Sequence, residues 1–387
     1  MPETSSSQRK LILIVDDTPT NLGVISGALG DTYRTKVATN GQKALALASA
    51  EEKPDLILLD VMMPEMDGYE VCSRLKADMA TQGIPVIFLT GQTSVEDETR
   101  GFSVGAVDYV HKPFSPAIVK ARVHSHIQLR EARAQLAKQL DALKEELELA
   151  HQIQVSILPH QLPKVPGFDI AARFLPMAAV GGDYYDFIRV GEKQLGILIA
   201  DVSGHGLSSA LIASMLQVAL AGQVAHASQP GNVLAGLNRA LSGKFSNNFV
   251  TAAYVYLDLE ANLMRYAAAG HPPFVQFRSA TGTAEQIMEN GLVLGLLEDA
   301  CYDSLELTLE SGDRHILYTD GILEAANPAL EMYGVERLMH FLEKQRSLNA
   351  GEFADALLAD VGRWTEQPGE PNQQDDITLL VFDSMRV

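Results

Sequence analysis

The chain has 387 residues, of which 47% are apolar, and a formal net charge of −19. This is a globular composition with room for two ordinary domains of roughly 150 residues each. There is no dense run of lysine and arginine, so nucleic acid, which requires clusters that neutralise phosphates, is not an expected partner. Cys72 and Cys301 are far apart and the first residues lack a signal-peptide pattern, so we expect a reducing, cytoplasmic location.

From Lys10 to about Arg122, short apolar runs alternate with longer amphipathic segments, and the runs are predicted to be buried strands at 11–15, 55–60, 85–90 and 108–110. A βαβ series of this kind predicts an α/β doubly wound sheet, in which the functional site lies at the carboxyl ends of the strands. The polar residues at or just past those ends are Asp16, Asp17, Asp60, Thr90 and Lys112.

These five residues are suited to acyl-phosphate chemistry on an aspartate. Such chemistry needs a divalent cation, a nucleophilic carboxylate, and cationic or hydroxyl groups for the incoming phosphoryl oxygens. Asp16, Asp17 and Asp60 offer the oxygen ligands that Mg²⁺ prefers. Lys112 supplies a positive charge and Thr90 a hydroxyl group.

With IVDD, LLDVMMPEMDGYE, FLTG and HKPF in order, this region resembles a CheY-like receiver domain. The resemblance implies a five-stranded parallel sheet and phosphorylation of Asp60 by a histidine kinase or phosphotransfer protein. It also implies a Mg²⁺ ion held by Asp16, Asp17, Asp60 and the Met62 carbonyl, with Thr90 and Tyr109 repositioned by phosphorylation.

Between about Ser115 and Leu158, apolar residues follow a heptad spacing. This predicts a long linker helix that pairs with the same helix of a second chain in a homodimeric coiled coil. Arg133 and Gln154 nevertheless occupy heptad positions that should be apolar. The alternative is a helix packed on its own domain. A second stretch, residues 206–225, carries no charge, but its polar residues favour a buried core helix over a membrane span.

Beyond Pro166, strand-like runs alternate with a few helical segments, which predicts an α+β layered domain. The predicted strands are 168–174, 184–190, 195–202, 250–257, 264–269, 316–319 and 377–382. Four acidic motifs accompany them: VGGDYYD, ADVSGHG, YTDG and QQDDIT. Oxygen ligands of this kind favour Mg²⁺ or Mn²⁺, and two such ions about 4 Å apart activate water for phosphomonoester hydrolysis. Gly182 and Gly321 would allow close backbone approach to the metal.

From about Leu149 to Phe382 the order LAHQIQVSILP, VGGDYYDF, IADVSGHG, AAAGHPP, LYTDGILEA and DDITLLV resembles the SpoIIE/RsbU-type branch of the PPM metal-dependent protein phosphatases. The resemblance implies two Mn²⁺ or Mg²⁺ ions, with Asp201 bridging both. The remaining ligands would be Asp183, Asp320, either member of the pair Asp375 and Asp376, and the Val202 carbonyl. A glycine is usual at the position of Val202.

Other interpretations of these motifs stay open. His205 and His271 suit a general acid, but a turn or core histidine is at least as consistent with their positions. The tripeptide at 181–183 is similar to the GGD of cyclic-dinucleotide synthases, although the Glu-Phe continuation of that motif is missing. No arginine is placed to clamp a phosphate.

The sequence thus predicts a receiver at 8–122, a helical coiled-coil linker at 123–158 and a PPM-type phosphatase at 159–387. Phosphorylation of Asp60 would control the hydrolysis of phosphoserine or phosphothreonine on a partner protein. The resemblance implies that this partner is a STAS-domain anti-sigma factor antagonist. The competing hypothesis is a non-catalytic adaptor that binds a sigma factor or its antagonist. Loss of metal carboxylates would mark such an adaptor, and here all four motifs retain theirs.

Overall fold

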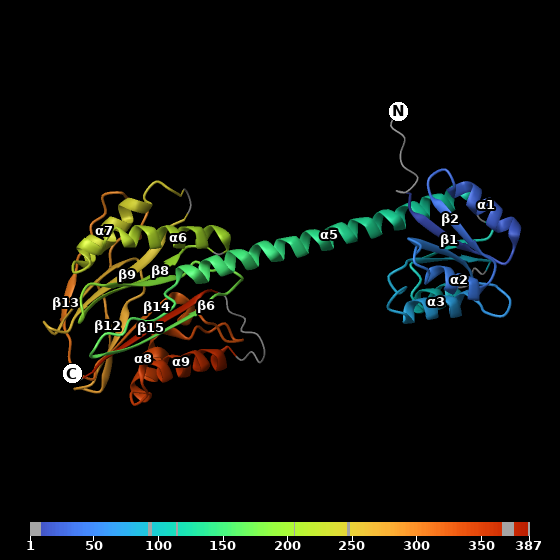
Figure 1. Cartoon of the computed structure of the whole chain (residues 1–387). Helices are drawn as coiled ribbons and strands as arrows, with labels where there is room; N and C mark the ends of the chain where they lie inside the picture. Colours follow the sequence, from blue (N-terminus) through green and yellow to red (C-terminus); the bar gives the residue numbers. More distant parts are fainter. Residues whose placement is uncertain are drawn as a thin grey trace. The chain divides into compact units, whose positions relative to one another are not determined.

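The computed structural model describes residues 9–91, 95–113, 115–204, 206–245, 248–365 and 375–385 (Figure 1). The chain divides into two compact units, residues 1–142 and 143–387. This division falls within one long helix, α5, so the three-segment partition predicted from the sequence stays a prediction.

The first unit is a five-stranded, all-parallel sheet in the order β2-β1-β3-β4-β5, which confirms the predicted doubly wound fold. Its strands are β1 (Leu11–Val15), β2 (Arg34–Ala38), β3 (Leu56–Asp60), β4 (Val86–Thr90) and β5 (Asp108–His111). Its helices are α1 (Pro19–Leu29), α2 (Gly41–Ala48), α3 (Gly68–Ala77), α4 (Val95–Ser103) and the first part of α5 (Pro116–Ile157).

Local sequence explains where these helices begin. The Asn40 side chain caps α2 by accepting from the backbone N–H of Lys43, and the Asp67 side chain caps α3 by accepting from that of Glu70. Pro19 opens α1, where its missing N–H has no helical partner to lose. Strands β1, β3 and β4 are wholly buried, as expected for parallel strands covered on both faces. They therefore bring the ends that carry Asp16, Asp60 and Thr90 to one edge of the sheet.

Helix α5 is continuous over 42 residues, close to the predicted span. Near its start, Arg122 and His126 both bind the Asp108 carboxylate at the beginning of β5, at 2.6 and 3.0 Å. In its middle, Leu136, Leu140 and Leu143 are half or more exposed. Those leucines are therefore left uncovered by their own chain among the described residues.

The second unit contains two five-stranded antiparallel sheets, β13-β10-β9-β8-β7 and β12-β11-β14-β15-β6. The strands of the first are β7 (Tyr184–Arg189), β8 (Gln194–Val202), β9 (Val250–Asp258), β10 (Leu263–Ala269) and β13 (Leu305–Thr308). Those of the second are β6 (Phe168–Leu175), β11 (Phe274–Arg278), β12 (Thr283–Ile287), β14 (Arg314–Tyr318) and β15 (Ile377–Ser384). The helical segments are α6 (Leu207–Ala221), η2 (Val224–His226), α7 (Pro230–Leu241), η3 (Asp320–Ile322), α8 (Gly334–Lys344) and α9 (Ala350–Trp364).

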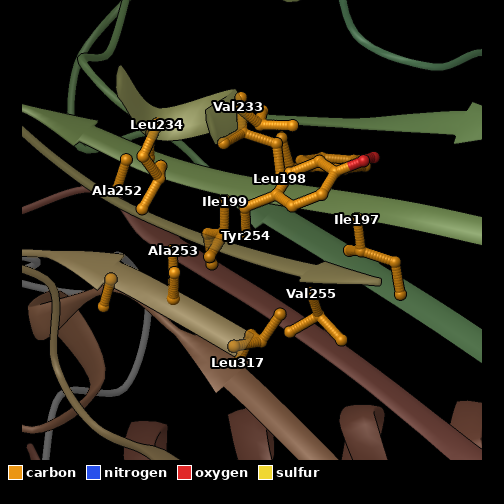
Figure 2. Close-up of a cluster of buried hydrophobic side chains, with 14 of the residues drawn as sticks. Ile197, Leu198, Ile199, Val233, Leu234, Ala252, Ala253, Tyr254, Val255 and Leu317 are labelled. Carbon is orange, nitrogen blue, oxygen red and sulfur yellow. The ribbon is translucent and has the colours of Figure 1, made fainter. Parts of the chain in front are cut away.

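These elements form four layers. Helices α6 and α7 cover the first sheet, while α8 and α9 cover the second (Figure 1). Residues alternate between the two faces of each strand. Leu198 and Tyr254 accordingly lie on the α7 side of the first sheet, whereas Ile197 and Val255 face Leu317 of the second sheet (Figure 2). The main core therefore lies between the sheets and beneath the α6–α7 layer, as the predicted layered fold requires.

Four strands were missed in the sequence, namely β2, β11, β12 and β13. Three of them are edge strands, so their alternating polar residues meet solvent and leave no continuous apolar run. The uncharged stretch that imitates a membrane span forms α6, which has only 15 residues. No helix in the described part of the chain has the length and apolar character needed to cross a membrane.

Candidate functional site

The first unit places a carboxylate pocket at the carboxyl edge of its sheet. Asp16, Asp17 and Asp60 each offer an oxygen within 4.8 Å of the others, an arrangement that fits one Mg²⁺ ion. Lys112 Nζ lies 2.9 Å from Asp16 Oδ2 and 2.8 Å from Asp60 Oδ2. Asn21, which the sequence analysis missed, donates to both Asp16 oxygens at 3.0 Å. The predicted phosphoacceptor thus lies beside its own lysine.

Burial and Lys112 act on Asp60 in opposite directions. Burial raises the pKa of Asp60, and the hydrogen bond and charge of Lys112 offset part of that rise. Burial alone would lower the pKa of Lys112, but its hydrogen bonds to Asp60 and Asp16 produce a net rise. Lys112 therefore stays charged, and it neutralises part of the pocket without any ion.

The remaining receiver residues lie around this pocket. The Met62 backbone N–H donates to Asp60 Oδ1 at 3.4 Å, while its side chain is exposed. Thr90 is buried at the end of β4, where its carbonyl accepts from the Lys112 backbone N–H at 2.7 Å. Tyr109 is half-buried and makes edge-to-face contacts with Phe102 and His111. Phosphorylation-dependent movement of Thr90 and Tyr109 stays a prediction.

The second unit gathers its acidic motifs at one end of the two facing sheets. Along β8, Asp201 shares the face of Ile197 and Ile199, so the alternation that builds the core also points its carboxylate between the sheets. Asp183 directly precedes β7, and Asp320 follows β14 at the start of η3. The four-layer fold therefore brings carboxylates that are distant in sequence into one centre.

The pKa shifts of these carboxyl groups indicate that they are neighbours. Burial, with repulsion from Asp320 and Asp375, raises the pKa of Asp201 to about 7. Burial, followed by repulsion from Asp375 and Glu324, raises the pKa of Asp320 to about 6. Burial and repulsion from Asp201 also place the pKa of Asp183 well above its ordinary value. Glu324 was not singled out in the sequence, although it follows Asp320 within the same motif.

This cluster of carboxylates is suited to binding cations, because no positively charged side chain of the described residues lies beside it. In the described structure no lysine or arginine nitrogen lies within 4.0 Å of Asp183, Asp201 or Asp320. Buried carboxylates that lack a fixed counter-charge favour divalent ions with oxygen ligands. Among the described residues, no three carboxylate oxygens of this cluster lie within 4.8 Å of one another. A centre with two ions does not require such a close group, because its ligands are distributed over two ions about 4 Å apart.

The adjacent pair at 375–376 divides into two roles. Asp376 accepts from the backbone N–H groups of Met177 (2.7 Å) and Gly182 (2.5 Å), so its carboxylate is used to hold the loop before Asp183. Asp375 acts on Asp201 and Asp320, whose pKa values it raises. The geometry therefore favours Asp375 as the metal ligand and Asp376 as a support for the loop.

The two glycines serve close contacts between backbone segments. A Cβ on Gly182 would collide with the Val202 carbonyl, and one on Gly321 would collide with the Asp376 carbonyl. Both positions exclude side chains because neighbouring segments cross there, whereas the sequence analysis attributed the glycines to approach of the metal itself. The Val202 carbonyl lies beside Gly182, and its role as a ligand stays a prediction.

Of the two histidines considered as general acids, His271 lies among the described residues. His271 is 1% exposed, and its Nδ1 lies 3.0 Å from the hydroxyl of Thr251, which pairs with Asp201 across β8 and β9. Burial lowers the pKa of His271 to about 3, which disfavours the imidazolium form as a general acid near pH 7. His205 lies outside the described residues.

The last turns of α5 form hydrogen bonds with the loop that carries Asp183. Gln154 is 3% exposed, and its side-chain amide donates to the Gly181 carbonyl (2.7 Å) and accepts from the Gly181 N–H (2.9 Å). His151 Nδ1 lies 2.6 Å from the Ala179 carbonyl in the same loop. The signal available in the sequence was a polar residue that interrupts the apolar seam, and Gln154 attaches α5 to the loop before Asp183.

Comparisons with known proteins agree with this architecture. Residues 191–384, about half of the chain, match the family model of Stage II sporulation protein E (SpoIIE), and residues 12–124 match that of the response regulator receiver domain. The phosphoserine phosphatase RsbU of Bacillus subtilis is 32% identical over 243 residues, which are 62% of this chain and 70% of RsbU. Both predicted family resemblances are confirmed.

Two further similarities help to define the domains. A probable cyclic di-GMP phosphodiesterase of Vibrio cholerae is 48% identical over 136 residues, which are 35% of this chain and 31% of that protein. The SiaA-PP2C domain of Pseudomonas aeruginosa superimposes with a TM-score of 0.57 at 23% identity, covering 64% of this chain and 99% of that domain, and this likeness supports the fold. The chain therefore belongs to the SpoIIE family and combines a response regulator receiver domain with a SpoIIE/RsbU-type PP2C phosphatase domain.

Proposed function

We propose that this protein hydrolyses phosphoserine or phosphothreonine on a partner protein and that phosphorylation of Asp60 controls the reaction. The observation that carries the proposal is the convergence of the buried Asp183 with the partly buried Asp201, Asp320 and Asp375. Two Mn²⁺ or Mg²⁺ ions bound at this centre would supply an activated water and neutralise the phosphoryl oxygens. The four carboxylates would hold these ions, with Asp201 central among them.

The residues around the carboxylates fix their geometry. Asp376 holds the loop before Asp183 through two backbone N–H groups. The β8–β9 pairing sets Asp201 opposite Thr251. The ligands are thus held by strand ends rather than by free loops, which keeps them in place between turnovers.

Control by Asp60 requires a physical connection, and α5 offers one. Its first turns bind Asp108 through Arg122 and His126, beside Tyr109. Its last turns bind Gly181 through Gln154. A phosphoryl group at Asp60 that favours one arrangement of α5 would thereby shift the loop before Asp183. We expect phosphorylation to activate the enzyme.

The partners follow from the domain composition. A receiver implies a phosphodonor, for which we propose a histidine kinase or phosphotransfer protein. Similarity to the phosphoserine phosphatase RsbU supports a phosphoserine-containing protein as the substrate. We propose that this protein is a STAS-domain anti-sigma factor antagonist, as the family resemblance of the sequence implies. The exposed seam of Leu136, Leu140 and Leu143 supports a homodimer through α5. A monomer at micromolar concentration by light scattering, with and without beryllofluoride, would contradict the dimer.

The catalytic proposal is tested by phosphate release from a phosphoserine-containing STAS-domain protein with and without Mn²⁺. We expect turnover that depends on Mn²⁺ and disappears with EDTA. The adaptor hypothesis predicts binding of the same protein without phosphate release. Retention of all four acidic motifs in one partly buried centre favours the enzyme.

A further inference from the structure

Two threonine hydroxyls converge on a single oxygen of Asp183. Thr319 Oγ1 donates to Asp183 Oδ2 at 2.7 Å, and Thr378 Oγ1 donates to the same oxygen at 2.6 Å. Both threonines are 0% exposed and Asp183 is 1% exposed. Two short hydrogen bonds to one carboxylate oxygen, in a place that water does not reach, fix the orientation of the carboxylate.

The donors come from a different sheet than their acceptor. Asp183 directly precedes β7 of the first sheet, whereas Thr319 directly follows β14 and Thr378 lies in β15, both in the second sheet. Thr319 is also the residue before Asp320, and Thr378 lies three residues after Asp375. The hydroxyls therefore link Asp183 to the two segments that carry the other carboxylates.

The hydrogen-bond pattern fixes the direction of donation. Thr319 Oγ1 accepts from the backbone N–H of Thr378 at 2.9 Å, so its own proton is available for Asp183. The hydroxyl of Thr378 makes its hydrogen bond to Asp183 Oδ2. Both donors occupy Oδ2, and neither uses Oδ1. Their arrangement thus separates a supporting oxygen from one that can face an ion.

We propose that Thr319 and Thr378 are positioning residues that orient Asp183 so that its Oδ1 binds a divalent cation of the phosphatase centre. This inference rests on the proposed function, because it requires a metal at that centre. Groups that orient metal ligands from behind typically contribute about 10- to 100-fold to metal affinity. The alternative is that the threonines are satisfied core hydroxyls that contribute to stability alone.

Thr378→Val is the sharper of the two variants. It keeps the shape of the side chain and removes one donor to Asp183. Thr319→Val would in addition leave the buried N–H of Thr378 without that acceptor, which mixes a folding effect into the result. Thr378→Ser keeps the hydroxyl and serves as the conservative rescue. Thr378→Cys replaces Thr378→Val if the latter does not fold.

Thr81→Val is the matched control. Thr81 is also buried, at 1% exposed, and its hydroxyl donates to the Leu75 carbonyl at 2.8 Å within the receiver. Thr81→Val removes the same hydroxyl group from a buried site, but this site is not in contact with a carboxylate of the phosphatase centre. Every variant is made in the full-length Asp17→Asn protein, so that binding at the receiver pocket is weakened and the phosphatase centre is measured.

The measurement is isothermal titration calorimetry with MnCl₂, together with thermal unfolding in EDTA. We expect Thr378→Val to raise the Kd for Mn²⁺ about 10- to 100-fold, Thr378→Ser to stay within about threefold, and Thr81→Val to leave the Kd unchanged. If Thr378→Val lowers the unfolding temperature as Thr81→Val does but leaves the Kd unchanged, the positioning role is wrong. If the Asp17→Asn protein itself binds no Mn²⁺, the proposed function fails as well.

Discussion

The receiver pocket and the phosphatase centre both collect carboxylates at strand ends, but they balance the negative charge differently. In the receiver, Lys112 Nζ lies within 3 Å of both Asp16 and Asp60. Around Asp183, Asp201 and Asp320, the described residues place no lysine or arginine nitrogen within 4.0 Å. The receiver carries its own cation, whereas the phosphatase centre depends on bound ions.

This difference in charge balance suits the two centres to different functions. A pocket that is partly neutralised by Lys112 can stay ionised with or without an ion and respond to a single phosphoryl group. A centre in which burial, followed by repulsion from Asp320 and Asp375, raises the pKa of Asp201 to about 7 favours a divalent cation that offsets the negative charge. The same residue type therefore suits the proposed switch in one unit and the proposed metal centre in the other.

The largest expected effect comes from removing a phosphatase carboxylate. Asp201→Ala or Asp320→Asn should lower phosphate release by at least about a thousandfold, because the two-ion centre loses a ligand. In EDTA these variants should unfold at the same or a higher temperature than the wild type, since one source of repulsion is gone. Undiminished turnover in Asp201→Ala would contradict the assignment, and Asp186→Asn, outside the proposed ligand set, provides the matched control.

A smaller effect is expected where α5 meets the metal-ligand loop. Gln154→Leu removes two buried hydrogen bonds to Gly181, and leaves a backbone N–H and carbonyl unpaired at a cost of about 1–3 kcal/mol each. We expect turnover to fall about tenfold and the response to beryllofluoride to weaken. Gln152→Leu, at an exposed position on the same helix, should change neither quantity. Equal behaviour of the two variants would show that α5 does not act through Gly181.

The smallest effect concerns acid stability in the phosphatase unit. His315 is 0% exposed and stacks on Phe382, and burial lowers its pKa to about 3. Below pH 6.5 the unfolded chain takes up a proton that the folded chain does not, so stability falls as the pH decreases towards 3. His315→Phe should reduce that slope by up to about 1.4 kcal/mol per pH unit in urea unfolding. An unchanged slope would assign the acid sensitivity to other groups.

The sequence predicted every interior strand except β11, but only three of the six edge strands. Strands such as β3 are continuous apolar runs because both faces are covered, whereas β12 presents polar side chains to solvent and resembles a loop. Among site residues, motif spacing brought out the carboxylates. Asp375 and Asp376 could not be separated, because adjacent residues on an extended chain point to opposite sides and only the tertiary fold decides which side holds the metal.

Supporting residues were harder to find for a related reason. Thr319 and Thr378 are ordinary strand-end residues by pattern, and their role depends on the packing of one sheet on the other. Gln154 left a visible sign, a polar residue in an apolar seam, but its partner is a backbone group, for which the sequence has no signature. Contacts to main-chain atoms and between sheets are what the sequence alone does not reveal.

The central claim is that modification of Asp60 controls hydrolysis at the second centre, and one comparison tests it most directly. Phosphate release from a phosphoserine-containing STAS-domain protein, at saturating Mn²⁺, is measured for the wild type and Asp60→Ala, each with and without beryllofluoride. We predict that beryllofluoride raises turnover of the wild type and leaves Asp60→Ala unchanged. Equal rates in all four conditions, with modification of Asp60 in the wild type verified, would contradict the account.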